Sequence, residues 1–218
     1  MTTLVLATTN AGKLREIRDV LAGLAIEVRA LADFPAIAEP EETGRTFEEN
    51  ARAKALYYAG ATGALVVAED SGLEIDALDR APGVYSARFG GDRAPTYPEK
   101  FALVYRMLDE RGAPESTARF ACALALSRPG EILFEARGTI EGRITSPPRG
   151  SGGFGYDPIF FYPPFGCTLA EVPAERKTSV SHRGQAFRRL GEYLEAQGSR
   201  LTAQDSRLRV ENVRRATL

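Results

Sequence analysis

A short apolar run, a polar turn that contains glycine and an amphipathic helix open the chain in that order. Residues 4–7 are apolar, and the sequence Thr-Thr-Asn-Ala-Gly at 8–12 interrupts them. From Lys13 onward the apolar side chains recur at the spacing of one helix face, at Leu14, Ile17, Leu21 and Leu24. This opening predicts a buried strand that passes through a turn into a helix.

In the rest of the sequence, predicted helices and strands alternate at first, and two neighbouring predicted strands follow. A second helix is predicted to begin near Thr46, where Thr46 and Glu49 match a capping box, and to end at Gly60. An apolar strand over 65–68 is expected to end at the sequence Glu-Asp-Ser-Gly. The remaining patterns predict helices at 98–111 and 186–196, and strands at 73–78, 118–127, 132–140 and 159–161. Early alternation followed by a strand pair predicts an α/β fold with a mixed sheet.

The charge and composition of the chain exclude several classes of protein. Of 218 residues, 44% are hydrophobic and 26% are charged, which suits one large domain or one domain with two lobes. Basic and acidic residues number 28 and 29, so the basic excess of a general nucleic-acid binder is lacking and we expect no nucleic-acid partner. No leader sequence and no apolar stretch near the ~20 residues of a membrane span are visible. We therefore expect a cytoplasmic protein without a membrane partner.

The turn at the start of the first helix is a candidate phosphate site. A helix N-terminus presents free N–H groups and partial positive charge, and Thr8, Asn10 and Lys13 stand around this one. The segment is not a Walker A loop, because it lacks the Gly-Lys-Ser/Thr ending and spacing of that motif. A plain strand-to-helix turn with a solvated lysine is the alternative interpretation.

The second predicted helix carries two polar residues on its apolar face. That face is formed by Phe47, Ala51, Ala55 and Tyr58. At about 100° per residue, Asn50 and Lys54 fall within or beside it. Because unpaired buried polar groups are costly, both side chains indicate partners in the interior. A lysine that extends past the edge of the core to solvent is the alternative.

Three acidic residues near the second predicted helix and the strand at 65–68 are candidate metal ligands. Glu42 lies in the loop ahead of the second helix, and Glu69 and Asp70 follow the apolar strand at 65–68. Ligands of open α/β sheets gather at the carboxyl ends of strands, and carboxylates held there suit Mg²⁺, which prefers hard oxygen ligands. A simple turn at Glu-Asp-Ser-Gly is the alternative.

Two segments in the second half are candidates for ligand binding. The glycine-rich loop at 150–158 allows close backbone approach to a ligand, and its Phe154 and Tyr156 are able to stack on a base, with Asp157 beside them. A structural hairpin turn is the alternative. Further on, His182 is the only histidine, and Arg183 beside it is able to donate two hydrogen bonds to one acceptor group. A structural histidine is the alternative there.

Taken in order, six segments resemble one known family. They are 8–16, 42–55, 69–73, 81–88, 152–158 and 181–184. The chain resembles the Ham1/RdgB/inosine-triphosphatase family over about residues 4–196. The resemblance implies an elongated mixed sheet flanked by helices, two lobes with the active-site cleft between them, and a homodimer. It also implies Mg²⁺-dependent hydrolysis of non-standard purine nucleoside triphosphates (ITP, dITP and XTP) to the monophosphate and pyrophosphate, which cleans the nucleotide pool.

The resemblance also implies roles for individual residues. The phosphates would be held by Thr8, Thr9, Asn10, Ala11, Gly12 and Lys13, together with Lys54 and Lys177. Glu42 and Asp70 would bind Mg²⁺, and Asp70 would also be the general base for the attacking water. Ser71 would touch the substrate. The base pocket would be lined by Phe154, Gly155, Tyr156 and Asp157, and the 6-keto purine edge would be recognised by His182 and Arg183.

The chain departs from the family pattern at two visible positions. Thr9 stands where many members have glycine, and Glu69 stands where many have a second aspartate. We expect a single two-lobed pyrophosphatase domain at 1–198 and a basic extension of open role at 199–218. Two alternatives remain: a Maf-like pyrophosphatase with another base preference, and a nucleotide-binding module without catalysis, which would have no need of Glu42 and Asp70.

Overall fold

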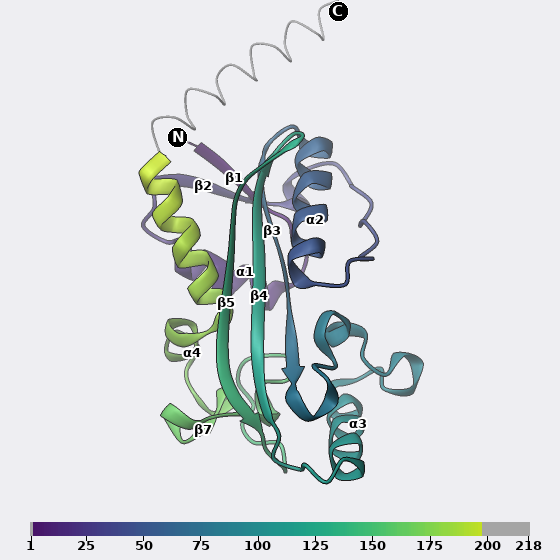
Figure 1. Ribbon diagram of the computed structural model, residues 1–218. Helices are drawn as coiled ribbons and strands as arrows, with labels where there is room; N and C mark the ends of the chain where they lie inside the picture. Colours follow the sequence, from purple (N-terminus) through teal and green to yellow (C-terminus); the bar gives the residue numbers. More distant parts are fainter. Residues whose placement is uncertain (1, 198–218) are drawn as a thin grey trace, which may run out of the picture.

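A computed structural model describes residues 2–197 as a seven-stranded mixed sheet with helices on both faces (Figure 1). The strands are β1 (Thr2–Leu6), β2 (Ile26–Ala30), β3 (Leu65–Ile75), β4 (Thr117–Arg128), β5 (Glu131–Ile144), β6 (Phe160–Tyr162) and β7 (Cys167–Thr168), in the order β2-β1-β3-β4-β5-β6-β7. β1 runs parallel to β2 and β3, and the other pairs are antiparallel. The predicted α/β class with a mixed sheet is confirmed.

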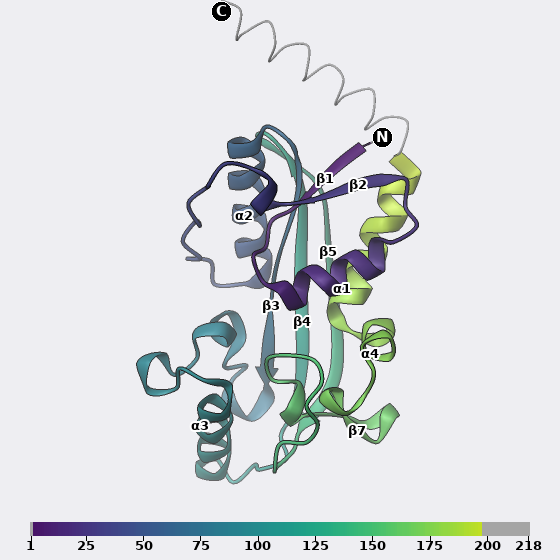
Figure 2. The same ribbon diagram turned by 180° about the vertical axis from the view of Figure 1, so that it is seen from behind.

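The helices divide between the two faces of the sheet. They are α1 (Ala11–Leu21), α2 (Phe47–Thr62), α3 (Tyr97–Glu110), α4 (Ala174–Val180) and a last helix at 182–197. In the upper lobe of Figures 1 and 2, α2 covers one face of the sheet, and α1 and the last helix cover the other. Because side chains alternate along a strand, Val67 packs with α1 and the last helix, whereas Val66 packs with α2.

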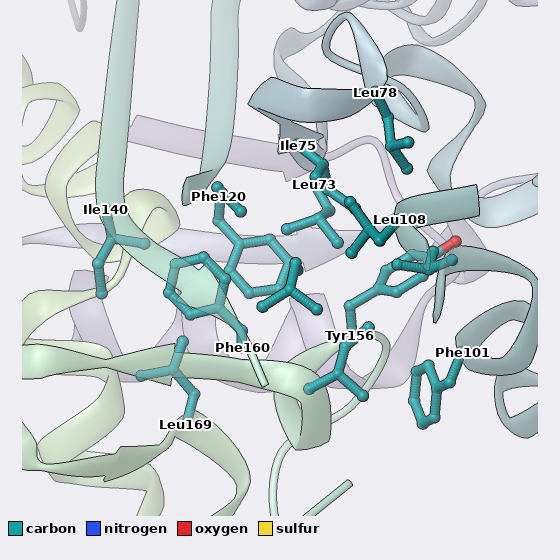
Figure 3. Packing of buried hydrophobic residues seen from close by; sticks show 14 residues of the cluster. Leu73, Ile75, Leu78, Phe101, Leu108, Phe120, Ile140, Tyr156, Phe160 and Leu169 are labelled. Carbon is teal, nitrogen blue, oxygen red and sulfur yellow. The ribbon is translucent and has the colours of Figure 1, made fainter. Parts of the chain in front are cut away.

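The lower lobe has a separate apolar core. Strands β3, β4 and β5 run down the molecule from the upper lobe to α3 (Figure 1), and side chains of these strands, α3 and β6 form one buried cluster there. Phe120 from β4 and Phe160 from β6 pack with their ring centroids 4.6 Å apart in this core (Figure 3). The site described below lies where the two lobes meet.

Two predicted strands are one strand, and one predicted helix end is wrong. The strands predicted at 65–68 and 73–78 are joined, because β3 continues through Glu-Asp-Ser-Gly and pairs with β4 from Val66 to Ile75, and residues 76–78 form a 3-10 turn. Helix α2 does not end at Gly60 but continues to Thr62, and Gly63 ends it in the left-handed conformation (φ 66°). The sequence analysis also missed β2, β7 and α4. The basic segment 199–218 lies outside the described residues.

Among residues 2–197, no helix combines the length and the apolar character that crossing a membrane requires.

Replacement of Phe160 by alanine tests the lower core. Phe160 is fully buried, whereas the next residue, Phe161, is partly exposed and lies beside Arg143. We expect Phe160→Ala to lower the free energy of unfolding by about 3–5 kcal/mol, because it opens a cavity among packed side chains. Urea denaturation measures this, with Phe161→Ala as the control that costs clearly less. Equal costs for the two variants would show that the core is not centred on Phe160.

Candidate active site

A pocket of about 240 Å³ opens where β1 ends beside β3. β1 pairs with β3 only from Leu65 to Val67, and beyond Val67 the described residues place no strand against that edge of β3, an isolated bridge to Pro82 aside. At an open edge, side chains from both faces of the strand are able to reach the same space. Glu69, Asp70 and Ser71, which are consecutive and alternate between faces, all line this pocket.

The structure brings nearly all predicted site residues together here. The predicted residues that line the pocket are Thr8, Thr9, Asn10, Lys13, Glu42, Lys54, Asp70, Ser71, Phe154, Gly155, Tyr156, Asp157, Lys177, His182 and Arg183. Ala11 and Gly12 do not line it; they form the first turn of α1 behind it. A Cβ on Gly12 would lie 2.8 Å from Cδ1 of Phe154, so a side chain there would displace the aromatic ring.

The turn before α1 lines the pocket, and side chains of the turn itself cap its backbone N–H groups. Asn10 is the N-cap residue, and its Oδ1 accepts a hydrogen bond from the Lys13 N–H at 3.0 Å. The Thr8 hydroxyl accepts one from the Asn10 N–H at 3.2 Å. Together with the lysine ammonium, this helix N-terminus is an electropositive wall suited to anionic oxygens.

An acidic group lies on the α2 side of β3. Asn50 donates a hydrogen bond from Nδ2 to Asp70 at 2.8 Å. Asp70 is therefore the interior partner that the inward position of Asn50 predicted. Lys54 lies between two carboxylates: it hydrogen-bonds Glu42 and stands 3.9 Å from Asp70. Arg88 also donates to Glu42, at 3.1 Å, across from α2. Lys54 is therefore an interior cation with two acidic neighbours, not a lysine directed to solvent.

The two carboxyl groups have pKa values shifted in opposite directions, because their charged neighbours differ. Burial, and to a smaller degree the nearby Glu42 and Glu69, raise the pKa of Asp70 against the opposing effect of Lys54 and Asn50. Burial also acts on Glu42, but hydrogen bonds from Lys54 and Arg88 outweigh it and lower the pKa of that group. The site therefore favours proton uptake by Asp70 and opposes it at Glu42, each relative to the ordinary carboxyl group of its type.

A chain of buried ion pairs lies on the opposite side of β3. Lys177 contacts Asp157 at 2.6 Å and Glu16 at 2.8 Å. Arg183 is paired with the same Glu16 and lies 3.6 Å from Glu69, which in turn contacts Lys13 at 2.6 Å. This chain joins α1, the glycine-rich loop, α4, β3 and the last helix. It fixes the positions of three cations at one wall of the pocket.

Glu16 is a site residue that the sequence analysis missed. Its carboxylate holds Lys177 and Arg183 together, and despite burial their charges lower its pKa. The signal for it was its place three positions after Lys13, on the buried side of α1. Arg88, Ser86, Tyr97 and Glu39 border the same pocket or its acids and were missed as well.

The hydrogen bonds of Asp157 and Tyr156 are mainly structural, although both residues line the pocket. Asp157 accepts hydrogen bonds from the Phe154 N–H at 2.8 Å and from Lys177, with the same Oδ2. Gly153, at φ 67°, leaves room for that carboxylate, since a Cβ there would lie 2.1 Å from Oδ2. Tyr156 is buried in the lower core and donates its hydroxyl to the Ser86 carbonyl at 3.0 Å. Phe154 is the aromatic side chain that borders the cations, with Lys177 Nζ 4.5 Å from its ring centroid.

His182 is held as a neutral ring. It is buried and stacks on Phe120 with a centroid distance of 5.0 Å and an interplanar angle of 13°. Burial, then the charges of Arg183 and Lys177, lower the pKa of His182 well below its usual 6.5. Within residues 2–197, its Nδ1 and the Nε of Arg183 are buried without a hydrogen-bond partner. These two neighbouring nitrogen atoms are therefore available to hydrogen-bond a ligand.

The charged residues of the lining almost balance. Its acids are Glu39, Glu42, Glu69, Asp70 and Asp157, and its bases are Lys13, Lys54, Lys177 and Arg183. With His182 neutral, the lining carries a net charge of −1. No set of three or more His, Cys, Asp or Glu side chains among the described residues is arranged to hold a metal ion. A metal at this site would need oxygen ligands beyond the protein carboxylates.

Known proteins resemble this chain over nearly its whole length. The profile of the Ham1 family matches residues 4–193. A dITP/XTP pyrophosphatase of Geobacter sulfurreducens is 48% identical over 198 residues, which cover 91% of this chain and 99% of that protein. Another, from Listeria monocytogenes, is 46% identical over 194 residues, covering 89% and 95% of the two chains.

Solved structures agree with these sequence matches. A HAM1 protein from Coxiella burnetii superimposes with a TM-score of 0.83 at 40% identity, covering 90% of this chain and all of that one. The Ham1 protein of Staphylococcus aureus gives a TM-score of 0.80 at 34% identity, also over 90% of this chain and all of that one. The family profile, the relatives and the solved structures agree with one another, and the chain belongs to the Ham1 family.

Proposed function

We propose that this protein hydrolyses non-standard purine nucleoside triphosphates, such as ITP, dITP and XTP, to the monophosphate and pyrophosphate. One observation carries the proposal: a single pocket joins an acidic group with a lysine, a helix N-terminus and a wall of fixed cations beside a neutral histidine. The relatives named dITP/XTP pyrophosphatases support the same reaction. A binding module without catalysis would need no buried carboxylate of raised pKa beside the lysine.

The donor set of the pocket fits Mg²⁺. A triphosphate carries about four negative charges, and a lining of net charge −1 does not attract it without added cations. Glu42 and Asp70 are hard oxygen donors that share Lys54 as a neighbour, and Mg²⁺ is commonly bound by one or two carboxylates together with phosphate oxygens and water. Glu42 and Asp70 would hold the ion, which would neutralise phosphate charge and lower the pKa of bound water.

The residues at the phosphate end would position the triphosphate for attack. The N–H groups at the start of α1, with Lys13 and Lys54, would bind its oxygens, and Thr8 and Asn10 keep that turn in shape. Asp70 would take the proton of the attacking water, since burial raises its pKa, whereas Lys54 and Arg88 lower the pKa of Glu42. Positioning and electrostatic stabilisation would supply most of the catalysis.

Arg183, at one end of the cation wall, and the neighbouring His182 would recognise the base, whereas Lys13 and Lys177 would contact the phosphates. Arg183 is fixed by Glu16 and by a hydrogen bond of 2.9 Å to the Ser71 hydroxyl, and His182 beside it keeps a neutral ring. A 6-keto purine offers an acceptor to such donors, whereas the 6-amino group of adenine would face a donor and leave it unpaired. Phe154 would stack on the base from the side of α1.

Three further properties follow from this proposal and from the family resemblance. The substrates belong to the nucleotide pool, so we infer a house-cleaning role in the cytoplasm, where that pool is used. We also infer that the protein acts as a homodimer. The whole of residues 1–198 would serve as one pyrophosphatase domain.

Pyrophosphate release from a substrate panel tests the proposal. With Mg²⁺, we expect fast release from ITP, dITP and XTP, little from ATP and GTP, and loss of release with EDTA. GTP also carries a 6-oxygen, so its rejection would depend on the 2-amino group of guanine and not on the contacts to the 6-position. Rejection of ATP follows from the donor wall around Arg183. Release from ATP at the rate of ITP would contradict the proposed preference for 6-keto purines. No release from any nucleotide would favour a binding module without catalysis.

Replacement of Asp70 by asparagine tests the general base. The amide keeps the hydrogen bond to Asn50 but is unable to take a proton, so we expect kcat to fall by about 10² or more with little change in melting temperature. Asp76→Asn, just beyond the end of the same strand and outside the pocket, is the control and should keep its turnover. Near-normal turnover of Asp70→Asn would exclude the assigned role.

The pH dependence of stability tests the neutral state of His182. The pKa of His182 in the folded protein lies well below 6.5. Below about pH 6.5 the histidine is therefore protonated in the unfolded chain but stays neutral in the folded protein. This contribution to stability is present above pH 6.5 and is lost as the pH falls. We expect wild type to lose about 1 kcal/mol more than His182→Gln between pH 7.5 and 5.5, measured by denaturant unfolding. Identical losses would mean that the ring accepts the proton when folded.

A further inference from the structure

Glu69 joins two cations that belong to different ends of the pocket. Its buried carboxylate lies in the middle of β3, 2.6 Å from Lys13 Nζ and 3.6 Å from Arg183 Nη2. The thiol of Cys122 on the neighbouring strand also donates to it at 3.4 Å. Lys13 stands at the phosphate end, and Arg183 stands at the base end.

The remaining acids of the ion-pair chain do not reach Lys13. Glu16 and Asp157 hold Lys177, and Glu16 holds Arg183 from the side away from β3. Among the described residues, Glu69 is the acid that pairs with Lys13. The direction of that lysine therefore depends on one carboxylate, whereas Glu69 shares the orientation of Arg183 with Glu16 and Ser71.

We propose that Glu69 is a positioning residue that orients Lys13 toward the phosphates and Arg183 toward the base, and that its negative charge weakens the hold of the pocket on pyrophosphate. This inference rests on the proposed pyrophosphatase function. Glu69 touches the two cations and acts on the substrate through them.

The two effects of Glu69 have opposite consequences for binding and for turnover. Removal of its charge changes the lining from a net −1 to neutral and frees Lys13 for any phosphate oxygen nearby. Pyrophosphate should then bind more tightly. Turnover should fall, because correct placement of the cations is lost and tight product binding slows release. A variant with lower KM and lower kcat is the signature of this combination.

A purely structural ion pair would behave differently. Its loss would lower the melting temperature and would not tighten pyrophosphate binding. Glu74 offers a matched control on the same strand: it is also a buried glutamate, lies within 4 Å of Arg80, Arg119 and Arg137, and lies outside the pocket.

The experiment compares wild type with Glu69→Gln, Glu69→Asp and Glu74→Gln. Calorimetry with pyrophosphate and excess Mg²⁺ measures affinity, and steady-state kinetics on ITP measures KM and kcat. For Glu69→Gln we expect a Kd for pyrophosphate at least about threefold lower and a kcat on ITP at least about tenfold lower, with a lower KM. Glu69→Asp keeps the charge on a side chain shorter by about 1.5 Å, so pyrophosphate affinity should return to the wild-type value. Glu74→Gln should match wild type in affinity and kcat.

Two results would overturn the inference. One is a Kd for pyrophosphate that is unchanged or higher in Glu69→Gln, and the other is equal changes in Glu69→Gln and Glu74→Gln. The binding measurement needs no turnover. If wild type failed to hydrolyse ITP, the proposed function would fall, while the pyrophosphate affinities would still decide the role of Glu69.

Discussion

The early end of β1 is the constraint on which the site depends. β1 accompanies β3 only as far as Val67, and the chain then turns away through Thr8 into α1. That departure exposes one edge of β3 and places the N-terminus of a helix directly beside it. Consecutive side chains from opposite faces of β3 therefore meet in one pocket, and this gives Asp70 and Glu69 different neighbours within a short distance.

The polar residues of this pocket are fixed by one another. Removing charges from water is costly, and buried ion pairs offset that cost only when geometry and further hydrogen bonds are good. In the chain from Lys13 through Glu69, Arg183 and Glu16 to Lys177, every charged group has a neighbour of opposite charge, but among residues 2–197 the Oε1 of Glu69 and the Nε of Arg183 have no hydrogen-bond partner. Donors held in this way need little reorganisation when a substrate arrives, which is the condition for electrostatic catalysis.

Much of the site could be predicted from the sequence, and the misses have physical causes. Helical spacing placed Asn50 and Lys54 on an inward face, and the structure supplies the partners that their burial demands. The sequence Glu-Asp-Ser-Gly looks like a turn when read locally, but pairing with β4 along ten positions holds it as strand. The site was expected at the carboxyl end of the strand at 65–68. It lies instead at the carboxyl end of β1, beside the middle of β3. Gly60 looks like a helix end, yet it is exposed, and the left-handed residue that ends α2 is Gly63. Contacts such as Arg183 with Glu16, 167 positions apart, have no local signal at all.

The position of a bound substrate tests the central arrangement most directly. The measurement is a crystal structure with Mn²⁺ and an inosine triphosphate analogue that carries an imido bridge between the α- and β-phosphates, with anomalous scattering to locate the metal. We expect the hypoxanthine beside His182 and Arg183, the phosphates over the N-terminus of α1, and the metal between Glu42 and Asp70. A base bound at the Glu42 end, or a metal bound away from both carboxylates, would contradict this arrangement.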